Sequence, residues 1–292
     1  MGEFFGIGGY QREPEGYFSW QHLTFVTILM VVMVACALLL GLRNKKRSEK
    51  AKNKVLIITS FVINAIEIFK IVMFCVRDKD ALGWLNHLPL YLCSIQLIAI
   101  PLSAFSKGRV KEAALDFVTI FGLLGAVIGT YLAGQNYACY PVLSLDNVAS
   151  GITHSIAGFA SLYILIVGMA NMKEKNIFIT FAILMGFCIA AFIANLFLDS
   201  NYMFLVRGDG TPYDLVYNFV QGNKYCTLSA LSHCFCYILR RITGCTILLK
   251  GRRINVREKV GKINGLVNRK RRSGSFGVFV CVFLWGIWKL LS

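Results

Sequence analysis

Cys93 and His154 are two side chains within apolar stretches of this 292-residue chain that could together do nucleophilic chemistry. A thiol is mostly protonated at neutral pH, and a neighbouring imidazole can take its proton to give a thiolate. The thiolate can attack an ester carbonyl and hold the acyl group as a thioester. The alternative interpretation is that Cys93 is an unreactive buried thiol and His154 a packed, hydrogen-bonded residue.

The stretch from Leu85 to Phe105 carries Cys93 and reads LNHLPLYLCSIQLIAIPLSAF. It is apolar enough to cross a bilayer, yet it contains His87, Ser94 and Gln96 where an inert anchor would carry leucine and isoleucine. Polar side chains at membrane depth are costly unless they face a bundle interior or a cavity. We therefore expect this third span to hold the functional site.

A nucleophilic site also needs hydrogen-bond donors for the oxyanion and a group that orients the histidine. If the third span is one helix, Asn86 lies one heptad before Cys93 on the same face, and Gln96 lies almost one turn after it. Either amide is a candidate oxyanion donor. Asn195 and Asp199, one turn apart at the end of the sixth span, are candidates for orienting the imidazole.

Glu67 and Lys70 stand inside the second span at a spacing of three, with Asn64 three residues earlier. Residues at this spacing share one flank of a helix, so we predict that Glu67 and Lys70 form an intramembrane ion pair. Two interpretations of this pair stay open. It either fixes the orientation of the helix or takes part in a proton relay.

The composition predicts an all-α fold, a polytopic transmembrane helical bundle. Hydrophobic residues make up 56% of the chain, and several apolar stretches are each long enough, at roughly 20 residues, to cross a bilayer. A soluble fold is excluded on this basis. Six spans are clear, and a short seventh candidate runs from Ser229 to Leu239. The six clear spans are Leu23–Leu42, Val55–Val76, Leu85–Phe105, Leu115–Leu132, Ile152–Ala170 and Ile177–Leu198.

The net charge of +16 comes from 31 basic and 15 acidic residues, and the bases cluster in loops after the first, third and fifth spans. This bias is typical of cytoplasmic loops in a multi-pass protein of the cell membrane, so no nucleic-acid partner is expected. The head, residues 1–22, is then extracytoplasmic, and both Cys93 and His154 lie in the outer half of the membrane. The ten cysteines, mostly inside spans, do not indicate a disulfide framework.

Small residues mark the fourth and fifth spans as closely packed helices. Gly125 and Gly129 form a GxxxG pair in the fourth span, a pattern that lets a neighbouring helix approach. In the fifth span, Gly151, His154 and Gly158 share one helical face. A histidine flanked by glycines on its own face is expected to lie close to a neighbouring helix, which suits both packing and chemistry.

The bundle is predicted to occupy residues 23–224, and the chain changes character over residues 225–292. Between Arg240 and Arg272 there are twelve Lys or Arg and one Glu. One explanation is a reading-frame slip near Lys224, which would replace a seventh helix and its cytoplasmic tail. The alternative is a native basic tail that contacts anionic lipid headgroups.

Three segments resemble the YwaF-like integral membrane family, to which the eukaryotic transmembrane protein 164 group belongs. They are NHLPLYLCS (Asn86 to Ser94), GITHSIAG (Gly151 to Gly158) and NYMFLVRGDGTPYDLVYN (Asn201 to Asn218). The resemblance covers the chain from about Phe18 to Lys224. It implies acyl transfer between phospholipids, with Cys93 and His154 matching the cysteine and histidine of the family's motifs.

Three functional hypotheses follow. The first is a lipid acyltransferase or acyl hydrolase that acts on membrane lipids through Cys93 and His154, without metal or cofactor. The second is a transporter or small-molecule-binding membrane protein in which Glu67, Lys70, Gln96 and Asp199 line a path. The third is a non-catalytic scaffold whose polar residues only join helices.

Overall fold

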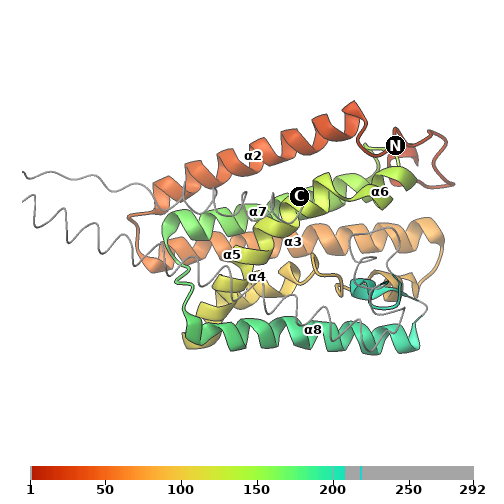
Figure 1. Cartoon of the computed structure of the whole chain (residues 1–292). Helices are drawn as coiled ribbons and strands as arrows, with labels where there is room; N and C mark the ends of the chain where they lie inside the picture. Colours follow the sequence, from red (N-terminus) through yellow and green to blue (C-terminus); the bar gives the residue numbers. More distant parts are fainter. Residues whose placement is uncertain (1, 199, 208–217, 219–292) are drawn as a thin grey trace, which may run out of the picture.

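Five helices of the computed structural model are long and apolar enough to cross a membrane, and they run along a common direction (Figure 1). The structure describes residues 2–198, 200–207 and 218; the atypical tail and the seventh-span candidate lie outside this part. The polytopic helical bundle expected from the sequence is therefore confirmed. The long helices are α2 (Trp20–Asn44), α3 (Glu49–Asp78), α5 (Gly108–Tyr131), α7 (Leu145–Val167) and α8 (Ile177–Phe197).

The helices α5 and α7 form the centre of the bundle, packed against each other and against α2, α3 and α4 (Gln96–Phe105). Their interior residues include the fully buried Phe117, Ile164 and Tyr163. The outer helices keep large apolar side chains exposed, such as Leu39 on α2, Phe61 on α3 and Phe178 on α8. An apolar surface of this kind fits the hydrocarbon interior of a bilayer.

The fifth span begins earlier than its sequence predicts. The loop expected from Ala133 to Gly151 contains a short helix, α6 (Gly134–Cys139), and α7 already begins at Leu145. Ser144 caps α7, since its hydroxyl accepts a hydrogen bond from the N–H of Asn147 at 3.3 Å. His154 therefore lies deeper along its helix than the predicted span placed it.

The third span is not one helix, which corrects the expectation from its apolar length. A short 3₁₀ helix, η1 (Gly83–His87), is followed by an irregular segment, and α4 begins only at Gln96. Pro89 explains the break, because proline disfavours helical backbone in the residue before it, and Leu88 has φ −58° and ψ 145°. The common helical face predicted for Asn86, Cys93 and Gln96 does not exist across this break.

Two glycines bring α5 and α7 together, but they are not the pair predicted from the GxxxG pattern. A Cβ added at Gly122 would lie 2.8 Å from the carbonyl oxygen of Ala157, and one at Gly129 would lie 2.1 Å from Nε2 of His154. A Cβ at Gly125 would meet nothing within 4 Å. The glycines that face α7 are thus one heptad apart, as expected for two helices packed at a small angle.

The basic connections gather at one end of the bundle. Asp116 of α5 is buried there, and its Oδ1 accepts hydrogen bonds from the N–H groups of Asn171 and Met172 at 3.2 and 3.0 Å. The hydroxyl of Tyr163 donates to the carbonyl of Lys52 at 3.1 Å, which ties α7 to α3. These contacts fix the loops after α2, α4 and α7 on the same side.

The head packs on the opposite end. The hydroxyl of Tyr10 donates to Asp146 at 2.5 Å, and Arg77 from the end of α3 reaches the same carboxylate oxygen at 2.8 Å. His22 is fully buried, with Nε2 3.1 Å from the carbonyl oxygen of Thr130, whereas Trp20 is exposed. The head is thus a packed part of the structure rather than an exposed extension.

Candidate functional site

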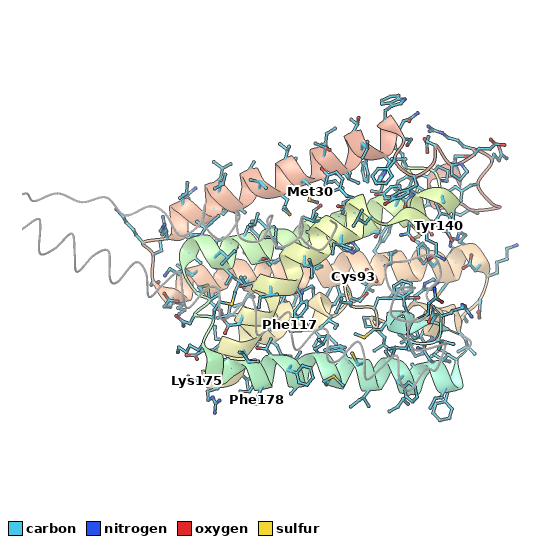
Figure 2. All side chains as sticks on the ribbon, viewed as in Figure 1. Met30, Cys93, Phe117, Tyr140, Lys175 and Phe178 are labelled. Atoms are coloured by element: carbon cyan, nitrogen blue, oxygen red, sulfur yellow. The ribbon has the colours of Figure 1, made fainter. Side chains whose placement is uncertain are left out.

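Cys93 lies in the irregular segment between η1 and α4, and not within a helix (Figure 2). Its side chain is exposed, and its sulfur is 4.0 Å from the hydroxyl of Ser94. The backbone from Tyr91 to Gln96 forms overlapping turns, in which the N–H of Ser94 bonds Tyr91 and that of Gln96 bonds Cys93. Irregular backbone at membrane depth is tolerated where it is held by protein or lines a polar space.

His154 reaches Cys93 from α7. The side chains of Cys93 and His154 are close enough to interact electrostatically with each other. The two residues that the sequence marked as candidate nucleophile and base thus lie near each other, although they come from elements far apart in the chain. Their roles stay a prediction.

The backbone of α7 fixes the protonation pattern of this imidazole. Nδ1 of His154 lies 2.7 Å from the carbonyl oxygen of Ser150, one turn earlier, and 3.4 Å from the hydroxyl of Ser150. Because a carbonyl only accepts, Nδ1 carries the proton and donates it. Nε2, on the side of Gly129, is left as the acceptor, and an unprotonated ring nitrogen is what a general base requires.

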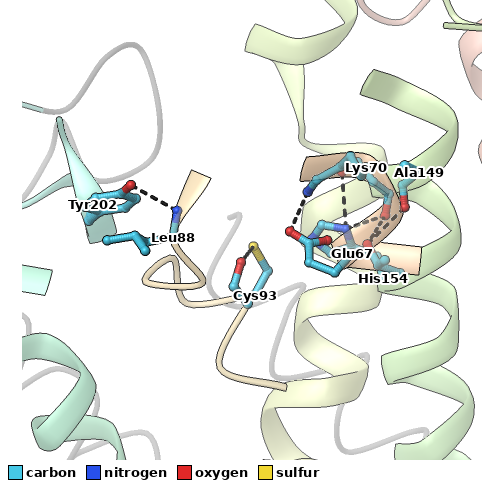
Figure 3. A network of polar contacts seen from close by, with 10 residues as sticks. Glu67, Lys70, Leu88, Cys93, Ala149, His154 and Tyr202 are labelled. Atoms are coloured by element: carbon cyan, nitrogen blue, oxygen red, sulfur yellow. Dashed lines mark hydrogen bonds and ion pairs between the residues drawn. The ribbon is translucent and has the colours of Figure 1, made fainter. Parts of the chain in front are cut away.

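Glu67 and Lys70 form an ion pair within α3, with Nζ 2.6 Å from Oε1. Their side chains are only 11% and 18% exposed. The charge of Lys70 also acts on both Cys93 and His154. Figure 3 shows Cys93 in its irregular segment and the Glu67–Lys70 pair beside His154.

The two predicted oxyanion donors, Gln96 and Asn86, lie in different elements and not on one helical face. Gln96 is the first residue of α4, one turn after Cys93, and is 2% exposed. Neither its amide nitrogen nor its amide oxygen has a hydrogen-bond partner in the described part of the chain. Asn86 lies in η1, on the other side of the break.

The structure does not bring Asn195 to the imidazole. Its amide instead holds the loop after α8, because Nδ2 donates to the carbonyl of Tyr202 at 2.9 Å and Oδ1 accepts from the N–H of Tyr202 at 2.8 Å. Asp199 lies outside the described residues. The carbonyl of Ser150 orients His154 in their place.

Two residues at the site were not predicted from the sequence. The hydroxyl of Tyr202, in η3 (Tyr202–Phe204), donates to the carbonyl of Leu85 at 2.6 Å and accepts from the N–H of Leu88 at 3.1 Å. It thus anchors the segment that leads to Cys93 (Figure 3). Gly129 leaves space for the imidazole of His154, because any side chain at this position would collide with the ring. Gly129 had a signal, as half of a GxxxG pair. Tyr202 lies in a segment that carries the family resemblance, but no spacing pointed to its role at the site.

No group of three or more His, Cys, Asp or Glu side chains within the described ranges is arranged to hold a metal ion.

Comparison with known proteins gives one match. The model of the TMEM164 family matches residues 17–240, a range that contains both Cys93 and His154 and runs past Lys224, where the resemblance in the sequence ended. No curated protein and no solved structure matches the chain. Since the family model covers well over half of the 292 residues, this multi-pass membrane protein belongs to the TMEM164 family.

Proposed function

We propose that this protein is a lipid acyltransferase or acyl hydrolase in which Cys93 is the nucleophile and His154 the general base. The observation that carries the proposal is that the thiol lies within electrostatic reach of an imidazole whose Nδ1 is held by the carbonyl of Ser150 at 2.7 Å. An imidazole locked in this tautomer can accept the thiol proton only at Nε2, the nitrogen on the side of Gly129.

The surroundings of the pair support a lipid as the substrate. Cys93 is exposed although it stands in a segment of a membrane-spanning bundle, so an ester group at the bilayer surface can reach it. Membership of the TMEM164 family supports the same chemistry, which the resemblance to the YwaF-like family implies. Membrane lipids are then both substrate and surroundings.

The orientation proposed for the membrane follows from charge. The basic end of the bundle faces the cytoplasm of the cell, and the head with Cys93 and His154 lies toward the outer side. The acyl transfer would then take place in the outer half of the bilayer.

The test is the intact mass of the detergent-purified protein after incubation with vesicles of mixed phosphatidylcholine and phosphatidylethanolamine. The native protein should gain the mass of one acyl chain, and hydroxylamine should remove it, because thioesters are cleaved by this reagent. Cys93→Ala should gain nothing, and His154→Ala should acylate roughly 100-fold more slowly or worse, the usual contribution of a general base. A native protein without any adduct would refute the acyl-enzyme mechanism.

A second candidate is a transporter or a non-catalytic lipid-binding protein. The observation that favours it is the broken third span beside the buried Glu67–Lys70 pair, since interrupted helices and intramembrane charges are common at transport sites. Glu67→Gln should abolish proton-coupled transport in proteoliposomes and leave acylation of Cys93 largely intact. Cys93→Ala should abolish acylation and leave any proton-coupled transport largely intact if the enzyme proposal holds.

A further inference from the structure

Gln96 is a buried amide whose hydrogen-bonding groups are unused. It is 2% exposed, and both Nε2 and Oε1 lack a partner in the part of the chain that the structure describes. Burying an amide without hydrogen bonds is unfavourable, and nearly all buried polar groups in proteins are paired. A glutamine that has no partner among the described residues is therefore expected to have one beyond them, such as a bound substrate.

The backbone places this amide beside the reactive thiol. The N–H of Gln96 bonds to the carbonyl of Cys93 at 3.3 Å, closing a turn of the 3₁₀ type. Residues three apart in such a turn project on the same side. Because Cys93 is exposed and Gln96 is buried, the amide lies inward of the sulfur.

The polar side chains of α3 and α7 near this part of the bundle are bonded to other groups. Asn64 on α3 donates from Nδ2 to the carbonyl of Leu97 at 3.0 Å and to that of Ser60 at 2.9 Å. Glu67 pairs with Lys70, and Nδ1 of His154 with the carbonyl of Ser150. These contacts fix α4 against α3. They leave the amide of Gln96, one turn after Cys93, as a donor without a partner among the described residues.

We propose that Nε2 of Gln96 donates a hydrogen bond to the carbonyl oxygen of the acyl group under attack at Cys93, and that the group recognised is the carboxylic ester of a lipid. This proposal rests on the proposed function. Gln96 would contact the reacting atoms and would count as a catalytic residue.

The reaction balances with the groups at the site. The thiol proton passes to Nε2 of His154, the sulfur of Cys93 bonds to the carbonyl carbon, and the electron pair of the C=O π bond moves to oxygen, where Gln96 stabilises the charge. The pair then returns, the C–O bond of the ester breaks, and His154 gives its proton to the leaving lysolipid oxygen. A lysolipid hydroxyl or water reverses these steps on the thioester.

The test uses Gln96→Met, which keeps a similar volume but has no donor. Vesicles of phosphatidylcholine and phosphatidylethanolamine serve as acyl donor, and the rate of adduct formation is followed by intact mass at several lipid concentrations. We expect the maximal acylation rate to fall roughly 100- to 1,000-fold, the cost of removing one oxyanion donor, with little change in the lipid concentration at half-maximal rate. The melting temperature should stay level or rise, because the substitution removes an unpaired amide.

Ser103→Ala is the matched control in the same helix. Ser103 is fully buried, and its hydroxyl donates to the carbonyl of Ile100 at 2.7 Å. Losing this bond should lower the melting temperature slightly and leave acylation unchanged, the opposite of the pattern expected for Gln96→Met.

Three outcomes separate the claims. Slow acylation by a stable Gln96→Met protein supports the donor role. Acylation at the native rate, or a loss of stability like that of a structural residue, overturns the role of Gln96 while the native adduct keeps the proposed function standing. A native protein without an adduct on Cys93 overturns both.

Discussion

His154 owes its position to the helix that carries it and to the glycine that faces it. The carbonyl of Ser150 fixes the ring through Nδ1 at 2.7 Å, and the missing side chain at Gly129 lets α5 approach the other edge of the ring. Cys93 and His154 could be singled out from the sequence, because polar residues in apolar spans are costly and therefore informative. Their pairing could not, because it depends on which helices lie side by side.

Gly129→Ala tests the room around the imidazole. A Cβ there would lie 2.1 Å from Nε2, so the ring or α5 must shift and the contact with Cys93 should be lost. We expect the rate of adduct formation to fall by about 100-fold, comparable to losing a general base. Gly125→Ala is the control, since a Cβ there would meet nothing within 4 Å. Both changes add the same methyl group to α5, so equal rates in the two variants would contradict the close packing on His154.

At the scale of elements, the break in the third span decides the chemistry. A continuous helix would satisfy every backbone group internally, whereas the irregular segment from Leu88 to Ile95 needs outside partners. Tyr202 supplies one of them, to the N–H of Leu88, and it also binds the carbonyl of Leu85 in η1. Its ring packs on Tyr91 with the centroids 5.2 Å apart. The loop after α8 therefore anchors the segment that leads to Cys93, a role that the resemblance of its sequence to the family did not specify.

Tyr202→Phe removes both hydrogen bonds of that anchor. The carbonyl of Leu85 and the N–H of Leu88 lose their partner, which should cost about 1–3 kcal/mol of stability. We expect the acylation of Cys93 to slow by more than that of Tyr163→Phe, which removes a hydroxyl bond to Lys52 at the basic end, 3.1 Å long in the native protein. Intact mass and thermal melting measure the two effects. Equal activity in the two variants would show that Tyr202 stabilises the fold without positioning the thiol.

At the scale of the whole molecule, the two ends of the bundle differ in chemistry. One end gathers the loops rich in lysine and arginine, and the other holds the head, Asp146 and the segment before Cys93. This separation is the physical basis of the proposed orientation, because positively charged loops stay on the cytoplasmic side.

Labelling with a membrane-impermeant maleimide tests this orientation. Cys139 is exposed near the head end, so intact cells should label it. A cysteine introduced by Ser106→Cys, in the loop after α4, should label only after the cells are permeabilised. The reverse pattern would place the head in the cytoplasm and contradict the proposed topology.

Tyr10 couples the packing of the head to pH. Burial, together with the hydrogen bond to Asp146, raises the pKa of Tyr10 from 10.0 to about 12. Because the folded pKa lies above the unfolded one, the stabilisation is complete below pH 10 and is lost as the pH rises to about 12. Thermal melting across this window should show a steeper loss for the native protein than for Tyr10→Phe. If the melting temperatures of the two proteins fall equally with pH, Tyr10 does not contribute to the loss of stability in this range.

The sequence by itself determined that the chain forms a bundle of membrane-spanning helices with its basic loops at one end. Apolar stretches of about 20 residues have no other stable arrangement in a bilayer, because every backbone group must be paired within the span. Only the tertiary structure decided where the third span breaks and which glycines face α7. It also decided that Cys93 and His154 lie near each other, and that Gln96 has no partner within the described ranges. These features depend on contacts between segments far apart in the chain. Helical spacing does not predict which residues share a face where Pro89 interrupts the helix and the hydroxyl of Tyr202 binds the irregular backbone.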